Sequence, residues 1–202
     1  MVANVLAQYD AIDILINNAG IGMRQSFVEM PVDTIEEIMR TNYFGAVYCT
    51  HEVLPSMIAK GQGHIVNISS VAGHIGTLNM AAYCASKFAL NGFSESLYNE
   101  LKPLGIDVSV VCPGPVKTAF NRAFAHTAPK SPRSLMMTAA AVSQNVIRAI
   151  EKKKFMVITP RSIAMMCAFK RFMPGFFRAI SYRVFRSYAA GDRRLSKERR
   201  KP

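Results

Sequence analysis

Four short apolar segments alternate along this 202-residue chain with longer segments of helical composition. The apolar segments predict β-strands at residues 12–17, 64–69, 107–112 and 155–158. Helices are predicted at residues 1–11, 31–60, 81–101, 138–152, 162–173 and 176–189. The first strand is apolar enough to be covered on both faces. Strands that alternate with helices predict an α/β fold built on a parallel sheet.

The composition excludes several classes of protein. Half of the residues are apolar, which fits a globular chain and excludes a disordered one. No signal pattern opens the sequence, and no apolar run reaches the ~18 residues of a membrane span. The four cysteines are scattered, and no histidine stands at a ligand spacing, so neither a disulfide nor a metal site is predicted. We expect a cytoplasmic protein with reduced cysteines.

The positive charge of the chain lies almost wholly in its last quarter. Residues 1–151 hold 10 Lys and Arg against 11 Asp and Glu, a balance of −1. Residues 152–202 hold 15 against 2, a balance of +13. An acidic partner is therefore expected at the C-terminal part of the chain.

Polar and glycine residues follow three of the predicted strands. Asn18, Ser70 and the pair Pro113-Gly114 each lie just past a strand end. Because parallel strands present their carboxyl ends at one edge, and ligands bind beyond that edge, these residues predict a binding site.

Tyr83 and Lys87 are four residues apart in a predicted helix, so their side chains share one face. A cation beside a phenol favours the phenolate, which predicts a lowered pKa for Tyr83. Such a tyrosine suits proton exchange with an alcohol or a ketone. Taken alone, the pair is a weak signal, because most such pairs are a buried tyrosine and a solvated lysine.

Five motifs in a fixed order decide between these readings. They are Asn17-Asn18-Ala19-Gly20, Thr41-Asn42-Tyr43-Phe44-Gly45, Asn67-Ile68-Ser69-Ser70-Val71-Ala72-Gly73, Tyr83-Cys84-Ala85-Ser86-Lys87 and Pro113-Gly114-Pro115-Val116-Lys117-Thr118. On these motifs the chain resembles the short-chain dehydrogenase/reductase family from about residue 10 to 120. The resemblance implies a partial Rossmann-like, doubly wound parallel sheet and an oxidoreductase that uses NAD or NADP.

The resemblance also implies roles for individual residues. Tyr83 would be the general acid/base, and Lys87 would lower its pKa and bind the nicotinamide ribose. Ser70 would hydrogen-bond the substrate oxygen. Ser69 competes for that role, but the thirteen-residue step to Tyr83 favours Ser70. Asn42 would anchor a water that links Lys87 to solvent.

Further residues would contact the cofactor. Asn18, Ala19 and Gly20 resemble the turn at which the backbone approaches it, with glycine allowing close contact. Tyr83 and Lys87 would contact it as well. The resemblance assigns the remaining cofactor contacts to Pro113, Gly114, Val116 and Thr118.

The sequence departs from the family at its beginning. The family's first strand and the Gly-rich loop that holds the pyrophosphate do not occur in these 202 residues. We therefore expect weakened cofactor binding and an exposed apolar edge at the strand of residues 13–17. Two interpretations remain: an N-terminally truncated form of an active enzyme, or a catalytically impaired remnant that acts as a membrane-surface binding or scaffold protein.

Residues 160–202 form a basic, Phe- and Met-rich segment that follows a truncated Rossmann-like domain at residues 1–159. At helical spacing its apolar residues gather on one side and its cations on the other, with Pro174-Gly175 dividing two helices. Such a segment is typical of a peripheral contact with an anionic membrane surface, strengthened by the basic run from Arg193 to Lys201. The alternative is a lid over the substrate site or a packing surface, with a solvated tail.

The expected substrate is a hydrophobic alcohol or ketone of steroid, retinoid or acyl type. The apolar loop residues that support this expectation are Phe120, Phe124, Leu135, Met136 and Met137. A homo-oligomer is expected from the resemblance. Nucleic-acid binding is not expected, because the chain has no motif that reads bases.

Overall fold

The computed structural model describes residues 1–9, 11–118, 120 and 136–198. Its four strands form one parallel sheet in the order β1-β2-β3-β4. The strands are β1 (Ile14–Asn17), β2 (Gly63–Ile68), β3 (Ile106–Pro113) and β4 (Met156–Thr159). The α-helices are α1 (Val2–Tyr9), α2 (Val32–Met39), α3 (Gly45–Lys60), α4 (Ala81–Leu101), α6 (Ala139–Glu151), α7 (Arg161–Phe172) and α8 (Pro174–Glu198). The predicted α/β fold with a partial Rossmann-like sheet is confirmed.

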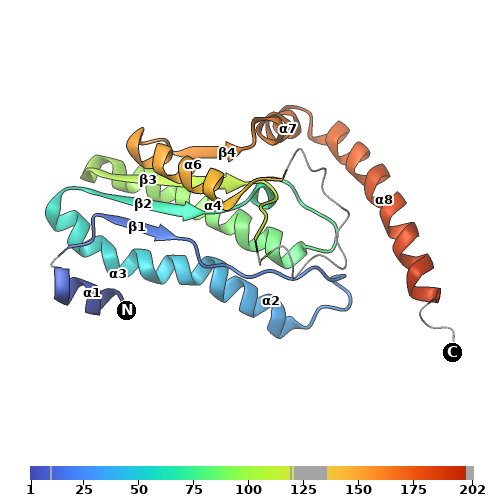
Figure 1. Cartoon of the computed structure of the whole chain (residues 1–202), viewed down its shortest axis with the longest axis horizontal. Coiled ribbons are helices and arrows are strands. Elements are labelled where there is room, and N and C mark those ends of the chain that lie inside the picture. The colour runs from blue at the N-terminus through green and yellow to red at the C-terminus, as the bar shows by residue number, and fades with distance from the viewer. Residues whose placement is uncertain (10, 119, 121–135, 199–202) are drawn as a thin grey trace.

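Helices cover both faces of the sheet, as Figure 1 shows. On one face α3 and α4 pack against β2 and β3, with a core that includes Val53, Met57, Ile65 and Leu97. On the other face α6 packs through Ala149 and its neighbours. Every residue of β3 is buried, including the polar Asp107 and Ser109 near its amino end, so both faces of this strand are covered.

The first strand forms the edge of the sheet. Ile14 and Ile16 are 45% and 47% exposed, and the far edge of β1 has no partner strand within the described residues. The expected apolar edge is confirmed. The prediction that this strand is covered on both faces is wrong, because Ile14 and Ile16 on one face are exposed and the main contacts of α6 are with β2, β3 and β4.

The helix predicted at residues 31–60 contains one irregular turn. A π-helical turn, η1 (Arg40–Phe44), joins α2 to α3, and its one extra residue per turn changes the direction in which its side chains point. Asn42 is buried within this turn.

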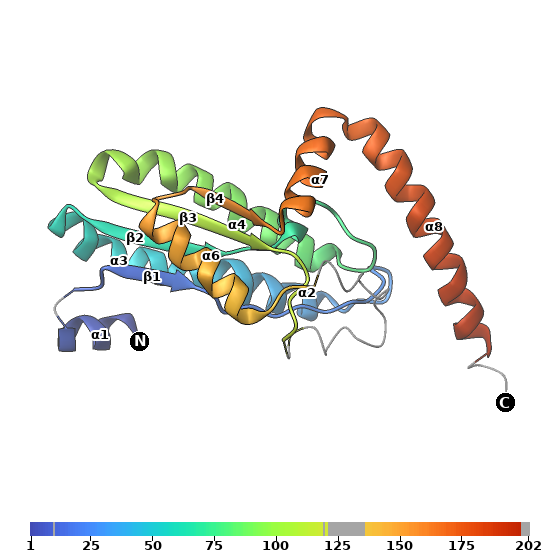
Figure 2. The same cartoon turned by 45° about the horizontal axis from the view of Figure 1, so that its top comes forward.

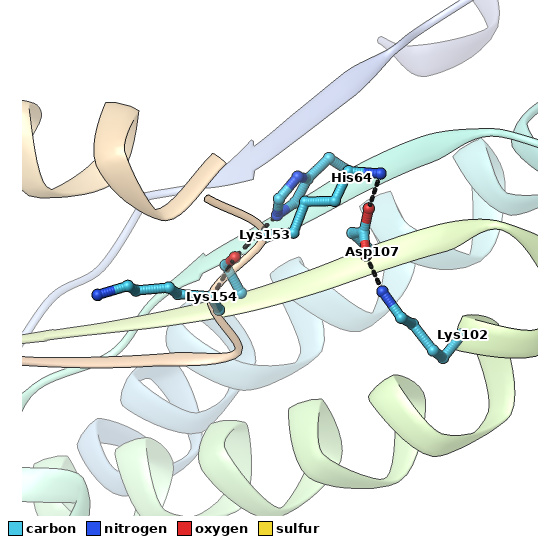
Figure 3. A network of polar contacts seen from close by, with 6 residues as sticks. His64, Lys102, Asp107, Lys153 and Lys154 are labelled. Carbon is cyan, nitrogen blue, oxygen red and sulfur yellow. Dashed lines mark hydrogen bonds and ion pairs between the residues drawn. The ribbon is translucent and has the colours of Figure 1, made fainter. Parts of the chain in front are cut away.

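The amino ends of β2 and β3 are held by a charged cluster, shown in Figure 3. Asp107 accepts from Lys102 at 2.6 Å and from Lys153 at 2.9 Å. Beside this cluster the ring of His64 contacts Ser109 Oγ at 2.8 Å, and Ser109 donates to the backbone oxygen of Lys154. Burial lowers the pKa of His64. The cluster therefore belongs to the end of the sheet opposite the predicted site.

The C-terminal helices leave the sheet after β4. The inner face of α7 is buried through Ile163 and Cys167, whereas α8 packs mainly against α7 and extends away from the rest of the chain (Figures 1 and 2). No helix among the described residues is long and apolar enough to span a bilayer. The division into two domains at residue 160 stays a prediction.

Candidate active site

The carboxyl ends of β1, β2 and β3 bring the predicted site residues to one edge of the sheet. Ser70 follows β2 and caps the short 3₁₀ helix η2 (Val71–Gly73), since its Oγ accepts from the backbone nitrogen of Ala72 at 3.1 Å. Tyr83 and Lys87 lie on the buried face of α4, which crosses this edge. The convergence predicted from the strand ends is therefore present.

The phenol of Tyr83 is 7% exposed. Burial raises its pKa above the ordinary value, and a side-chain hydrogen bond with Ser70 acts in the opposite direction. The prediction of a lowered pKa through Lys87 is wrong for this structure. The lysine nitrogen lies 5.9 Å from the centroid of the phenol ring, and desolvation of the phenolate is the larger effect.

Lys87 is held beneath the end of β2. Its Nζ donates to the backbone oxygen of Ile68 at 2.9 Å, and its side chain is buried. Burial lowers its pKa to about 8, so the amine stays mostly protonated at neutral pH. An ammonium group has three N–H donors, and the hydrogen bond to Ile68 uses one of them. Donors therefore remain for a hydroxyl-bearing ligand.

Asn42 connects three segments of the site. Its amide nitrogen donates to the backbone oxygen of Ile21 at 2.8 Å and to Ser86 Oγ at 2.9 Å, while its oxygen accepts from the nitrogen of Ile21. Ser86 in turn donates to the backbone oxygen of Tyr83. Asn42 therefore positions the loop after β1 against the helix of the Tyr-Lys pair, and its role in holding a water stays a prediction.

Gly20 closes the site on the side of β1. A Cβ at this position would lie 3.3 Å from Asn42 Oδ1 and 3.6 Å from Lys87 Nζ. The Cβ would crowd the Asn42 oxygen and meet the lysine nitrogen at ordinary contact distance, so glycine gives the backbone its closest approach to these two groups. The neighbouring Asn18 and Ala19 are exposed, and their predicted cofactor contacts stay predictions.

The motif after β3 lies partly against α7. The nitrogen of Gly114 donates to the backbone oxygen of Thr159 at 2.7 Å, and a Cβ on Gly114 would lie 2.7 Å from Ile163 Cδ1. Pro113 is buried, Val116 is half-buried and Thr118 is exposed. The structure gives Gly114 a packing role, and the cofactor contacts of this motif stay predictions.

Apolar side chains surround the phenol. The ring of Phe120 lies 5.7 Å from that of Tyr83, and Met80 belongs to the same cluster. Met136 and Met137 are half-buried, and Met137 pairs with Val116 in an isolated bridge. Phe124 and Leu135 lie outside the described residues.

Sequence reasoning missed a line of buried polar side chains behind the site. Asn17 donates to Thr50 and to Asn67, and Asn67 donates to Ser94 at 2.8 Å. Asn91 donates to the backbone oxygen of Gly73 at 2.9 Å and fixes the loop after Ser70. Polar residues within apolar strands and at every third or fourth position of α4 were the available signal.

Comparison with known proteins agrees with this geometry. The family described as short chain dehydrogenase matches residues 1–129. Dehydrogenase/reductase SDR family member 7B of Mus musculus is 36% identical over 200 residues, which cover 95% of this chain and 60% of that protein. Retinol dehydrogenase 8 of Bos taurus is 45% identical over 109 residues, covering 54% of this chain and 35% of that one.

A solved structure is similar over a larger share of its own length. A short chain dehydrogenase from Burkholderia cenocepacia J2315, in complex with NADP, has a TM-score of 0.75 and 25% identity, covering 90% of this chain and 72% of that chain. This chain thus spans 60% or less of the curated relatives named above. The match over residues 1–129 and the shared site motifs lead to one conclusion: the chain belongs to the short-chain dehydrogenase/reductase family.

Proposed function

We propose that this protein is an NAD(P)-dependent oxidoreductase that interconverts a hydrophobic alcohol and the corresponding ketone or aldehyde. The observation that carries the proposal is the joint burial of Tyr83 and Lys87 beside Ser70 at the carboxyl edge of a parallel sheet. An acid, a hydrogen-bond donor and a cation within one buried site suit proton exchange with a carbinol oxygen.

The residues fit the nicotinamide half of a dinucleotide. Lys87 has donors for ribose hydroxyls, and the glycine backbone at Gly20 leaves space beside its Nζ. When bound, the cofactor would donate or accept the hydride. Structures of family members with bound NADP support a nicotinamide cofactor without separating NAD from NADP.

The roles of the protein groups follow from their surroundings. Tyr83 would give its phenolic proton to the substrate oxygen during reduction, or take it during oxidation. The raised pKa of the buried phenol favours the protonated form, which suits the acid in the direction of reduction. Ser70 would bond the same oxygen, and the Lys87 ammonium would stabilise the phenolate that forms.

The surroundings of the phenol support an apolar substrate. Phe120 and Met80 contact the cluster around Tyr83. The similarity to a retinol dehydrogenase supports a lipid-like alcohol, although it covers only part of each chain. Steroid, retinoid and acyl-chain ketones are therefore the first candidates.

The test measures the oxidation of NADH or NADPH by the 202-residue chain, from the loss of absorbance of the reduced nicotinamide. Retinal, a steroid ketone and a long-chain ketone serve as substrates. Tyr83→Phe should reduce turnover by at least about a hundredfold. Tyr98→Phe is the matched control, because Tyr98 lies on the same helix but packs against Phe155. Equal turnover of both variants would refute the role of Tyr83.

Calorimetry with NADH and NADPH separates binding from chemistry. Binding of either nucleotide that weakens in Lys87→Met supports the proposed cofactor site. An absence of binding at millimolar nucleotide would contradict the oxidoreductase proposal for this chain. That result would favour the alternative role as a binding or scaffold protein, which the exposed surface of the C-terminal helices supports.

A further inference from the structure

The end of α7 and the beginning of α8 expose a row of apolar side chains that the described residues leave open to solvent. Phe172 is 82% exposed and Phe176 is 55% exposed, and Ile180 and Val184 continue the row at intervals of four residues. Residues four apart lie on one face of a helix, so the row is continuous along α8. We refer to Phe172, Met173, Phe176, Ile180 and Val184 as the arm face.

The arm face is flanked by cations without a compensating acid. Residues 160–186 contain six Lys and Arg and no Asp or Glu. Arg171, Arg178, Arg183 and Arg186 are exposed. On α8 the helical period sets Arg178 and Arg186 on the side away from Ile180, so the helix is amphipathic.

The base of the arm is fixed to the body by the opposite face of α7. Ile163 packs on Gly114, and Lys170 donates to the backbone oxygen of His74 while lying 5.3 Å from the ring of Phe88. Phe169 then contacts Phe176 edge-on at 6.0 Å, which joins α7 to α8. Figure 2 shows α8 projecting from this base away from the sheet. The base of the arm is therefore fixed to the body, while the residues of the arm face stay exposed.

Charge and shape together select the occupant of this surface. Residues 160–202 hold 12 Lys and Arg against 2 Asp and Glu, a balance of +10, so a second copy of the arm would bring two strongly positive segments together. Residues 1–159 hold 13 against 11, a balance of only +2. A nucleic acid would use the cations but not the large apolar side chains between them. An anionic bilayer interface accepts apolar side chains at the acyl boundary and arginines at the headgroups.

We propose that the α7–α8 arm binds anionic membrane surfaces, with the arm face inserted at the interface and the flanking arginines on the lipid phosphates. This binding does not depend on the enzymatic function proposed above. It makes the protein peripheral to the membrane, with the candidate active site at the base of the same arm.

The experiment is flotation of the full chain with vesicles of phosphatidylcholine alone or with about one third phosphatidylserine. We expect binding to the anionic vesicles that is lost at high salt. Two double variants separate the contributions: Ile180→Gln with Val184→Gln removes apolar surface, and Arg178→Glu with Arg183→Glu reverses charge. Each should lower partitioning by at least about tenfold, with helicity retained by circular dichroism because Gln and Glu favour helices.

Matched controls make the same chemical changes on the body of the protein. Phe27→Gln with Val28→Gln alters two exposed apolar residues, and Lys152→Glu with Lys154→Glu reverses two exposed cations. Both controls should float like the unaltered chain. The proposal is overturned if the chain does not float with anionic vesicles, or if the arm variants float as well as the controls.

Competing occupants give distinct results in the same series. Sedimentation velocity without vesicles would reveal a dimer that the Ile180→Gln, Val184→Gln variant converts to a monomer; that outcome would assign the arm face to self-association. Tighter binding to duplex DNA than to anionic vesicles would assign the cations to nucleic acid. Either result would overturn the membrane assignment.

Discussion

The ammonium nitrogen of Lys87 on α4 donates a 2.9 Å hydrogen bond to the backbone oxygen of Ile68, the last residue of β2. None of the ion pairs among the described residues includes this lysine. Its charge is therefore held by a carbonyl dipole within a buried site, and burial lowers its pKa from 10.5 to about 8.

Lys87→Met should change how stability depends on pH. The folded pKa is below the unfolded value, so the unfolded chain binds more protons between about pH 8 and 10.5. The contribution of Lys87 to the free energy of unfolding therefore rises with pH across this window. The free energy of unfolding of the variant, relative to that of the original chain, should therefore fall by about 1–3 kcal/mol from pH 7.5 to 10. Urea unfolding measures it, with Lys152→Met at an exposed site as control; a difference that is flat with pH would contradict the assignment.

Ser70→Ala should raise the pKa of Tyr83 further. Burial already raises this pKa, and the side-chain hydrogen bond with Ser70 is what opposes the increase. The phenolate absorbance of Tyr83, obtained by difference from the Tyr83→Phe background, reports the shift. Ser69→Ala is the control, because Ser69 Oγ bonds the backbone oxygen of Lys87. An unchanged pKa of Tyr83 in Ser70→Ala would contradict the hydrogen bond between Ser70 and the phenol.

Asp107→Asn should destabilise the fold by about 1–3 kcal/mol at neutral pH. Burial alone would raise the pKa of Asp107, but hydrogen bonds from Lys102 and Lys153 outweigh it and hold the pKa below its ordinary value. The stabilisation is therefore present above the unfolded pKa near 3.8 and is lost as the pH falls below it. Asp13→Asn, in the exposed pair with Lys60, should cost less than about 1 kcal/mol. Equal losses in the two variants would contradict the role of burial.

Substitution by alanine at two glycines should change the free energy of unfolding in opposite directions. A Cβ on Gly73 would lie 2.6 Å from Asn91 Nδ2 and 2.8 Å from the backbone oxygen of Lys87, so Gly73→Ala should destabilise by about 2 kcal/mol. A Cβ on Gly92, exposed on α4, meets nothing within 4 Å. Gly92→Ala should stabilise by about 0.5–1 kcal/mol through helix propensity. Thermal unfolding of both variants measures this, and a stabilised Gly73→Ala would show that the loop can yield.

Patterns that repeat within one element were readable from the sequence. The strands and α4 were predicted within one or two residues, because apolar runs and Gly or Pro stops define them. The meeting of Ser70 with Tyr83 also followed, because parallel strands direct their carboxyl ends to one edge.

Features that depend on contacts between distant segments were not readable. The pKa of Tyr83 reflects the burial of the phenol, which the Tyr-Lys spacing does not reveal. The role of Ser86 needs Asn42 as its partner, 44 residues away.

The π-helical turn between α2 and α3 makes this part of the chain sensitive to length. It directs Asn42 inward while the flanking helices keep their own apolar faces on the core. Removing one residue between positions 40 and 44 would rotate all of α3 about 100° around its axis. Val53 and Met57 would then leave the interior, so substitutions in this turn are better tolerated than deletions.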